Sequence, residues 1–303
     1  MELRTPVRLS WDLSSAHDLS YDDIAAAILA AKFLALDLRD EELSPACRTL
    51  LHRLHGAPLG VTLAVSCCVL RAACCESELP PFLFAPPVRL LLVEIASPEE
   101  LPHVAEVVRA AQGRVPVGIS FPVSRGSWEA LPEVVRFCVA EDIPHLAIPM
   151  TRVVAGEECL VLTPAEQRRL GDSLAAGPQL DPRRLSVHDP FLWRLLHPGA
   201  PFPEGSCQAA NTMLHIAADG TVYPCPLGPV SLGSLHEAGL GEILTSAAKR
   251  EVREKLRRHP AGCQGCSALA SCHGGCRGRA YALTGSWDAP DPGCGVVPGG
   301  DGP

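Results

Sequence analysis

The sequence predicts an α/β protein in which a partial (β/α)6-type barrel is followed by a small cysteine-rich domain. Strand-like and helix-like segments alternate with short connections through the first two thirds of the chain, which is typical of a parallel sheet wrapped by helices. The alternation supplies fewer β–α units than a closed eight-fold barrel needs, so we expect an incomplete barrel. After a proline- and glycine-rich stretch, seven of the 14 cysteines cluster near the C-terminal end.

The expected elements follow from residue period and helix caps. Residues 7–13 alternate like a strand, and two acids open an Ala-, Ile- and Leu-rich helix over residues 22–34. Residues 88–95 are almost continuously apolar, as buried parallel strands tend to be. Ser97 and Thr163 each begin a capping box with proline at the first helical position. The other expected strands are residues 33–38, 59–65, 115–123, 145–150 and 185–189, and the other expected helices are residues 45–54 and 128–139.

Composition shifts along the chain predict its domains. Proline and glycine are dense just before the first of the clustered cysteines, as in a linker, and the last residues resemble a frayed tail. The expected segments are the barrel over residues 1–197, a linker over 198–206, the cysteine-rich domain over 207–294, built from a β-hairpin plus helices, and the tail over 295–303.

Charge and hydropathy exclude several classes of function. The net charge is −8, from 34 acidic and 26 basic residues, and no long basic stripe is present, which argues against a nucleic-acid partner. The basic run in residues 249–258 alternates with acids and is interpreted as a solvated helix face. No apolar run is long enough to cross a membrane, and residues 1–6 lack the features of an export signal. We therefore expect a cytoplasmic, reducing location, where metal ligation is favoured over disulfides.

The last seven cysteines have a regular spacing. Cys207 and Cys225 are separated by x12-Gly-x4, a Cys-x2-Cys-x5-Cys-x3-Cys pattern begins at Cys263, and Cys294 closes the set. A hairpin turn at residues 218–221 would bring the first two cysteines near each other. The sequence therefore predicts that these thiols act together.

Thiolates are soft ligands that suit either zinc or iron–sulfur clusters. Structural zinc takes four ligands per ion, and seven cysteines do not divide into fours. Two cubane clusters need eight ligands, which leaves one position to another residue, to solvent or to a substrate. Gly274 and Gly275 would let the backbone pass close to a bulky cluster without Cβ clashes.

The cysteine order, together with the phrases DGTVYPC ending at Cys225, LGSL at residues 232–235 and GGCRGRA around Cys276, resembles the complete SPASM signature of radical SAM peptide-modifying enzymes. The resemblance implies two auxiliary [4Fe–4S] clusters behind a radical SAM partial barrel. Several family members have a further cysteine where this chain has Pro201 or Phe202, which leaves the fourth ligand of one cluster open. The implied ligands are Cys263, Cys266, Cys272 and Cys294 for one cluster, and Cys207, Cys225 and Cys276 for the other.

The barrel of that family carries Cys-x3-Cys-x2-Cys after its first strand, where three thiolates leave one iron free to bind and cleave S-adenosylmethionine. Here residues 13–23 contain no cysteine. His17 and Asp18 stand where the family has Cys-Asn, and Tyr21 stands at the second cysteine. Residues 38–43 replace the expected Gly-Gly-Glu motif. The resemblance therefore supports the two auxiliary clusters as cofactors but does not support S-adenosylmethionine.

Two other groups attract attention. The pairs Cys67-Cys68 and Cys74-Cys75 do not reproduce the missing spacing, and neighbouring residues on extended backbone point apart, so they are interpreted as small apolar residues beside a strand end. His188-Asp189, at the end of the last expected strand, is interpreted as a hydrogen-bonded structural pair.

The leading hypothesis is a degenerate radical SAM–SPASM protein that is not itself an enzyme. Such a chain is similar to the SPASM partner proteins encoded beside an active radical SAM enzyme in peptide maturation, including those of GeoRSP systems. It would bind a radical SAM enzyme or a precursor peptide and relay electrons. Two alternatives stay open: an active radical SAM peptide-modifying enzyme with an unusual cofactor site, and a structural scaffold whose clusters only fold the C-terminal segment.

Overall fold

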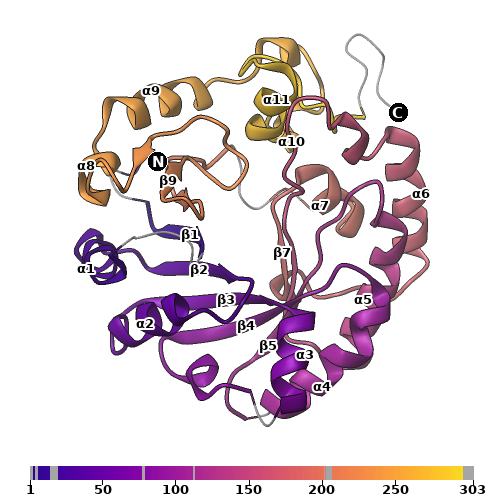
Figure 1. Cartoon of the computed structure of the whole chain (residues 1–303). Coiled ribbons are helices and arrows are strands. Elements are labelled where there is room, and N and C mark those ends of the chain that lie inside the picture. Colours follow the sequence, from indigo (N-terminus) through magenta and orange to yellow (C-terminus); the bar gives the residue numbers. More distant parts are fainter. Residues whose placement is uncertain are drawn as a thin grey trace.

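The fold is built on one ten-stranded sheet, shown in Figure 1. The computed structural model describes residues 3, 6–13, 20–76, 79–111, 113–200, 202 and 207–295, excluding the side chains of residues 75 and 76. Seven strands run parallel in chain order, β1-β2-β3-β4-β5-β6-β7, and six helical crossovers connect them. The strands are β1 (Arg8–Asp12), β2 (Ala35–Asp40), β3 (Gly60–Ser66), β4 (Val88–Glu94), β5 (Val117–Ser120), β6 (Leu146–Ile148) and β7 (Leu185–Val187).

The sheet does not close, because β1 and β7 are not paired with each other. Instead β8 (Met213–Ile216) pairs with β1 in parallel, and β9 (Thr221–Tyr223) and β10 (Gly233–Ser234) extend the sheet in antiparallel pairing. The predicted fold class, a partial (β/α)6-type barrel followed by a small hairpin-and-helix domain, is confirmed. In Figure 1 the C-terminal segments, orange to yellow, lie along the open side of the barrel.

Helices cover the outer face of the parallel strands (Figure 1). Several begin where the sequence predicts: both expected capping boxes form, at Ser97 and at Thr163. The barrel helices are α1 (Tyr21–Ala31), α2 (Pro45–Arg53), α3 (Cys67–Glu76), α4 (Leu101–Ala111), α5 (Leu131–Ala140), α6 (Pro164–Ala175) and α7 (Pro190–Leu196). The later helices are α8 (Leu240–Leu244), α9 (Ala247–Leu256), α10 (Leu269–Cys272) and α11 (Arg277–Thr284).

The alternation of side chains along each strand separates an apolar layer from a polar interior. In β3, Val61, Leu63 and Val65 are fully buried, whereas Thr62 and Ser66 face a central cavity. The other strands share this division, and the inward residues of β1 and β2 include charged side chains. The core therefore lies between sheet and helices, and the barrel interior is left for polar groups.

Helix α3 corrects one expectation. Its first residue, Cys67, follows directly on the end of β3, so the paired cysteines lie on a helix and not on extended backbone. Cys67 is buried, Cys68 is exposed, and Cys74 is partly buried against the core. No helix within the described ranges is long and apolar enough to cross a membrane.

Candidate metal centres and the adjoining cavity

A cavity of about 820 Å³ lies between the inner face of the barrel and the C-terminal segment. Inward-facing side chains of the parallel strands line one part of it. Four of the predicted ligands line another part: Cys207, Cys225, Cys272 and Cys276. The cysteine-rich segment thus borders the barrel interior directly.

The hairpin places the first two cysteines on neighbouring arms, as its sequence predicts. Cys207 precedes β8, and Cys225 follows β9. The arms are joined by the pairing of the two strands and by a hydrogen bond, 2.8 Å long, from the Ala210 N–H to the Pro224 carbonyl. Cys276 is the N-cap of α11, where its Sγ accepts the Arg279 N–H at 3.3 Å.

The structure brings these three thiols into electrostatic contact. Burial raises the pKa of Cys225 to about 12, and Cys207 contributes to the rise. Burial also raises the pKa of Cys276 well above its usual value, with Arg279 opposing the rise and Cys225 adding to it. Cys207, Cys225 and Cys276 form one set, which we call the cavity set.

The other four predicted ligands form a second set, which we call the outer set. Burial raises the pKa of Cys263, and the neighbouring thiols of Cys272, Cys294 and Cys266 raise it further. Cys263 ends a 3-10 turn, its carbonyl accepts the Cys266 N–H at 3.2 Å, and Cys272 ends α10. Cys263 therefore lies in the electrostatic field of the other three thiols of the outer set.

The donor chemistry of both sets fits iron–sulfur clusters, since each set offers soft thiol ligands. In the cavity set, N–H groups are also directed at the sulfur atoms of Cys225 and Cys276. Within the described ranges, no group of three or more His, Cys, Asp or Glu side chains is arranged to hold a single metal ion. Binding iron would require each thiol to lose its proton. A cluster would here supply one-electron redox chemistry.

The glycine pair before Cys276 permits close contacts within the protein. Gly274 and Gly275 both have positive φ, 88° and 71°. A Cβ on Gly274 would lie 2.6 Å from the Pro260 ring, and a Cβ on Gly275 would lie 2.5 Å from the Asp291 carboxylate. These glycines therefore permit close approach of protein groups around the cysteines.

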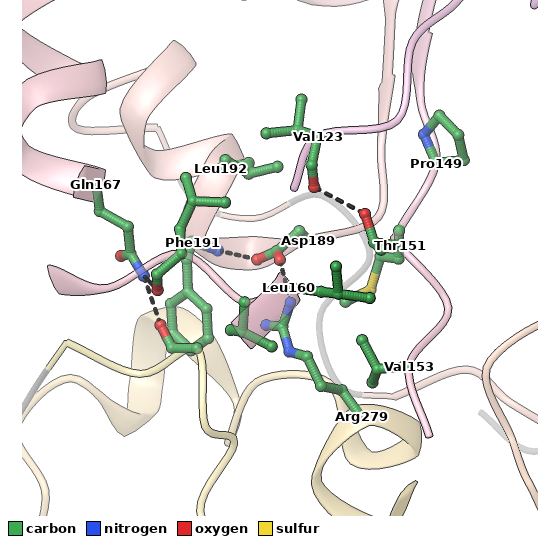
Figure 2. A pocket seen from close by; sticks show the side chains of 14 residues that line it. Val123, Pro149, Thr151, Val153, Leu160, Gln167, Asp189, Phe191, Leu192 and Arg279 are labelled. Carbon is green, nitrogen blue, oxygen red and sulfur yellow. Dashed lines mark hydrogen bonds and ion pairs between the residues drawn. The ribbon is translucent and has the colours of Figure 1, made fainter. Parts of the chain in front are cut away.

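A buried ionic group joins the cysteine-rich segment to the barrel. Arg279 Nη1 donates to Asp189 Oδ2 at 2.6 Å, and its Nε and Nη2 donate to the two oxygens of Asp291 at 2.7 and 2.8 Å. Figure 2 shows the Arg279 guanidinium reaching Asp189 beside Phe191. Burial alone would lower the pKa of Arg279, but the two carboxylates raise it well above its usual value. The sequence predicts a structural role for Asp189, and in the structure its partner is Arg279, ninety positions further along the chain.

Asp291 also orders both cysteine sets. Its Oδ2 accepts the Cys276 N–H at 2.6 Å, and its carbonyl accepts the Cys294 N–H at 2.8 Å. One residue therefore holds a member of the cavity set and a member of the outer set. Sequence reasoning missed this residue and Arg279, because nothing local distinguishes them from other charged residues.

The basic run on α9 is not a solvated face throughout. Lys249 and Arg253 are buried, 7% and 8% exposed. Arg253 Nη1 donates to the Cys207 carbonyl at 2.7 Å and to the Ala209 carbonyl at 3.3 Å. The expectation was wrong here because a helix turned toward the hairpin presents one basic stripe to backbone carbonyls that need donors.

Charged pairs stand at the carboxyl ends of the barrel strands, where barrels place functional groups. Arg152, after β6, forms an ion pair of 2.7 Å with Asp12 at the end of β1. His215 lies 3.7 Å from the same carboxylate, and its Nδ1 lies 3.0 Å from Ser10 Oγ. Burial lowers the pKa of His215 to about 4, although Asp12 opposes the shift, so the imidazole is neutral at pH 7.

A second pair spans the ends of β2 and β4, where Arg39 Nε donates to both oxygens of Glu94 at 3.0 Å. Cys68, at the start of α3, also faces the cavity.

Of the residues that replace the missing cysteine motif, His17 and Asp18 lie outside the described ranges. Tyr21 begins α1 and stacks on Trp11, with ring centroids 5.7 Å apart.

Comparison with known proteins identifies the cysteine-rich segment. Residues 207–267 match the family model of SPASM, described as an iron–sulfur cluster-binding domain. The cysteine-rich segment is similar to that domain. The chain is also 30% identical, over 93 residues, to the PqqA peptide cyclase of Granulibacter bethesdensis. That match covers 29% of this chain and 25% of the relative, so the chain corresponds to about a quarter of that protein.

Solved structures resemble nearly the whole chain in fold. The structure of native anSMEcpe with bound AdoMet and Cp18Cys peptide has a TM-score of 0.64 at 15% identity, covering 95% of this chain and 94% of that one. Streptococcus suis SuiB bound to S-adenosylmethionine has a TM-score of 0.62 at 13% identity, covering 93% of this chain and 76% of that one. The chain therefore shares the overall fold of these two solved structures.

Proposed function

We propose that the protein binds two [4Fe–4S] clusters, one on the outer set and one on the cavity set. Two observations support this: the SPASM match, and the separation of the seven thiols into a set of four and a set of three. In the cavity set the fourth iron would lack a cysteine, and this set borders the barrel interior.

We further propose that the chain is an accessory protein of peptide maturation and does not cleave S-adenosylmethionine. The observation that carries this is the chemistry at the end of β1: residues 13–23 contain no cysteine, and the neighbouring strand ends present ion pairs instead of thiols. In this proposal the clusters exchange single electrons with a radical SAM partner enzyme.

The cavity supports a peptide as the bound partner. Its volume of about 820 Å³ accommodates a short peptide segment, and its lining alternates apolar residues with charged pairs that can reach peptide side chains and backbone. A relative is named a PqqA peptide cyclase, and a structure of similar fold contains a bound peptide. The anchoring groups would be Asp12, Arg152 and Arg39, on three different strand ends.

Iron and sulfide content of the anaerobically purified protein tests the cluster count. We expect about eight of each per chain, and about four after Cys225→Ser or Cys266→Ser, because each substitution removes a ligand from one set. Cys159→Ser is the matched control, since Cys159 is an exposed cysteine of the barrel. Zinc in place of iron, or no loss in either ligand variant, contradicts the proposal.

A cleavage assay tests the accessory role. The reduced protein, incubated with S-adenosylmethionine and dithionite, is expected to form no 5′-deoxyadenosine, and its electron paramagnetic resonance spectrum should not change on adding S-adenosylmethionine. Multiple-turnover formation of 5′-deoxyadenosine would show that the chain is an active enzyme with an unusual cofactor site. Cys68→Ser would then locate that site, because Cys68 is the barrel cysteine that faces the cavity among the described residues.

A further inference from the structure

We propose that Arg277 is a single buried cation shared by the two clusters, and that it raises the reduction potentials of both. The inference rests on the proposed assignment of one cluster to each cysteine set. It concerns a residue that directly follows Cys276 and begins α11.

Arg277 lies near cysteines of both sets. It lines the cavity together with Cys207, Cys225 and Cys276. Its guanidinium interacts electrostatically with Cys207 and Cys276 of the cavity set and also with Cys263 of the outer set. The residue is only 1% exposed, so solvent screens these interactions little.

The hydrogen bonding of Arg277 leaves its Nε without an acceptor among the residues that the structure describes. Its Nη1 donates to the Arg258 carbonyl at 2.8 Å, and its Nη2 donates to the Trp287 carbonyl. Its buried Nε has no hydrogen-bond partner among the described residues. A buried N–H without an acceptor is costly, and sulfur atoms of a bound cluster would provide an acceptor here.

The sign of the effect follows from electrostatics. One-electron reduction makes a cluster more negative, and a buried cation or an N–H donor close to sulfur stabilises the more negative state. Arg277 therefore favours reduction of each cluster. The carbonyls of Arg258 and Trp287 hold the guanidinium in place, so that it does not turn toward one set.

Anaerobic redox titration followed by electron paramagnetic resonance tests the proposal, with dithionite as the reductant. In Arg277→Gln both midpoint potentials should become more negative, and in Arg277→Lys, which keeps the charge, both should shift less. Arg257→Gln is the control: it removes an equal charge from the end of α9, where Arg257 is half exposed and pairs with Glu254. Its potentials should match those of the unaltered protein.

The outcomes separate this inference from the proposed function. If the unaltered protein holds fewer than two clusters, both the cluster assignment and this inference are wrong. If it holds two clusters and Arg277→Gln keeps full iron with unchanged potentials, or shifts only one of them, the shared-cation role alone is wrong. Loss of iron from both Arg277 variants would assign the residue a structural role and would also overturn the inference.

Discussion

Replacement of Arg279 by methionine removes a cation that bonds two buried carboxylates, those of Asp189 and Asp291. The Arg279 side chain is 8% exposed, and those of Asp189 and Asp291 are 10% and 1% exposed. Methionine fills similar volume but donates no hydrogen bond. Asp291 keeps the N–H groups of Cys276 and Gly293 as donors, at 2.6 and 2.9 Å, and Asp189 keeps the Phe191 N–H at 2.8 Å.

The buried ion pairs of Arg279 set the loss of unfolding free energy that we expect for Arg279→Met. Removing one partner of a buried ion pair typically costs about 3–5 kcal/mol. The variant can relieve the repulsion by protonating one carboxyl, and keeping an ordinary aspartic acid protonated at pH 7 costs about 4 kcal/mol. Both routes give the same magnitude, so we expect Arg279→Met to lose about 4 kcal/mol.

The sign of the pH dependence follows from the same argument. In the folded variant a carboxyl is protonated, whereas in the unfolded chain it is ionised at neutral pH. The folded state then binds more protons, so its relative stability increases as pH falls from 7 toward 5, by up to about 1.4 kcal/mol per pH unit. The unaltered protein should not share this gain.

Urea unfolding under anaerobic conditions, followed by tryptophan fluorescence, measures the effect. Asp189→Asn, which keeps an oxygen acceptor beside Arg279, should lose only about 1–2 kcal/mol. The double variant Asp189→Asn with Arg279→Met should be more stable than Arg279→Met alone, because it removes the stranded charge. Additive losses in the double variant, or an Arg279→Met penalty that does not change with pH, would refute the buried-charge reasoning.

Three further predictions concern the hairpin and its neighbours. Lowering the pH from 6.5 to 4 should destabilise the protein by about 2–3 kcal/mol, because burial keeps His215 neutral in the folded state down to its pKa of about 4 while the unfolded chain binds the proton. His215→Asn should flatten that part of the pH–stability curve. Gly278→Ala should cost about 1–3 kcal/mol in urea unfolding, since its Cβ would lie 2.7 Å from a backbone carbonyl. Gly241→Ala, with nothing within 4 Å, should not destabilise α8. Arg253→Ala should lower the iron content, because the Cys207 carbonyl loses a donor at 2.7 Å, and unchanged iron would contradict a role in ordering that segment.

Elements whose signals are local were predicted well. The capping boxes at Ser97 and Thr163 form as expected, because side chain and backbone partners lie within one helical turn. The hairpin between Cys207 and Cys225 forms as expected, because its turn residues specify the reversal. By contrast, the sequence predicts extended backbone around Cys67, where the structure has helix α3, because a short apolar run is compatible with either structure.

The spacing of the last seven cysteines determined the family resemblance and the chemical class of the ligands, because ligand type and spacing are covalent properties of the chain. The β–α alternation determined the barrel in the same way, through the periods of its side chains. Only the tertiary structure decided that Arg279 bridges Asp189 and Asp291, and that Arg277 interacts electrostatically with cysteines of both sets. A buried charge is placed by desolvation and by partners from distant segments, and the one-dimensional order of residues does not contain that information.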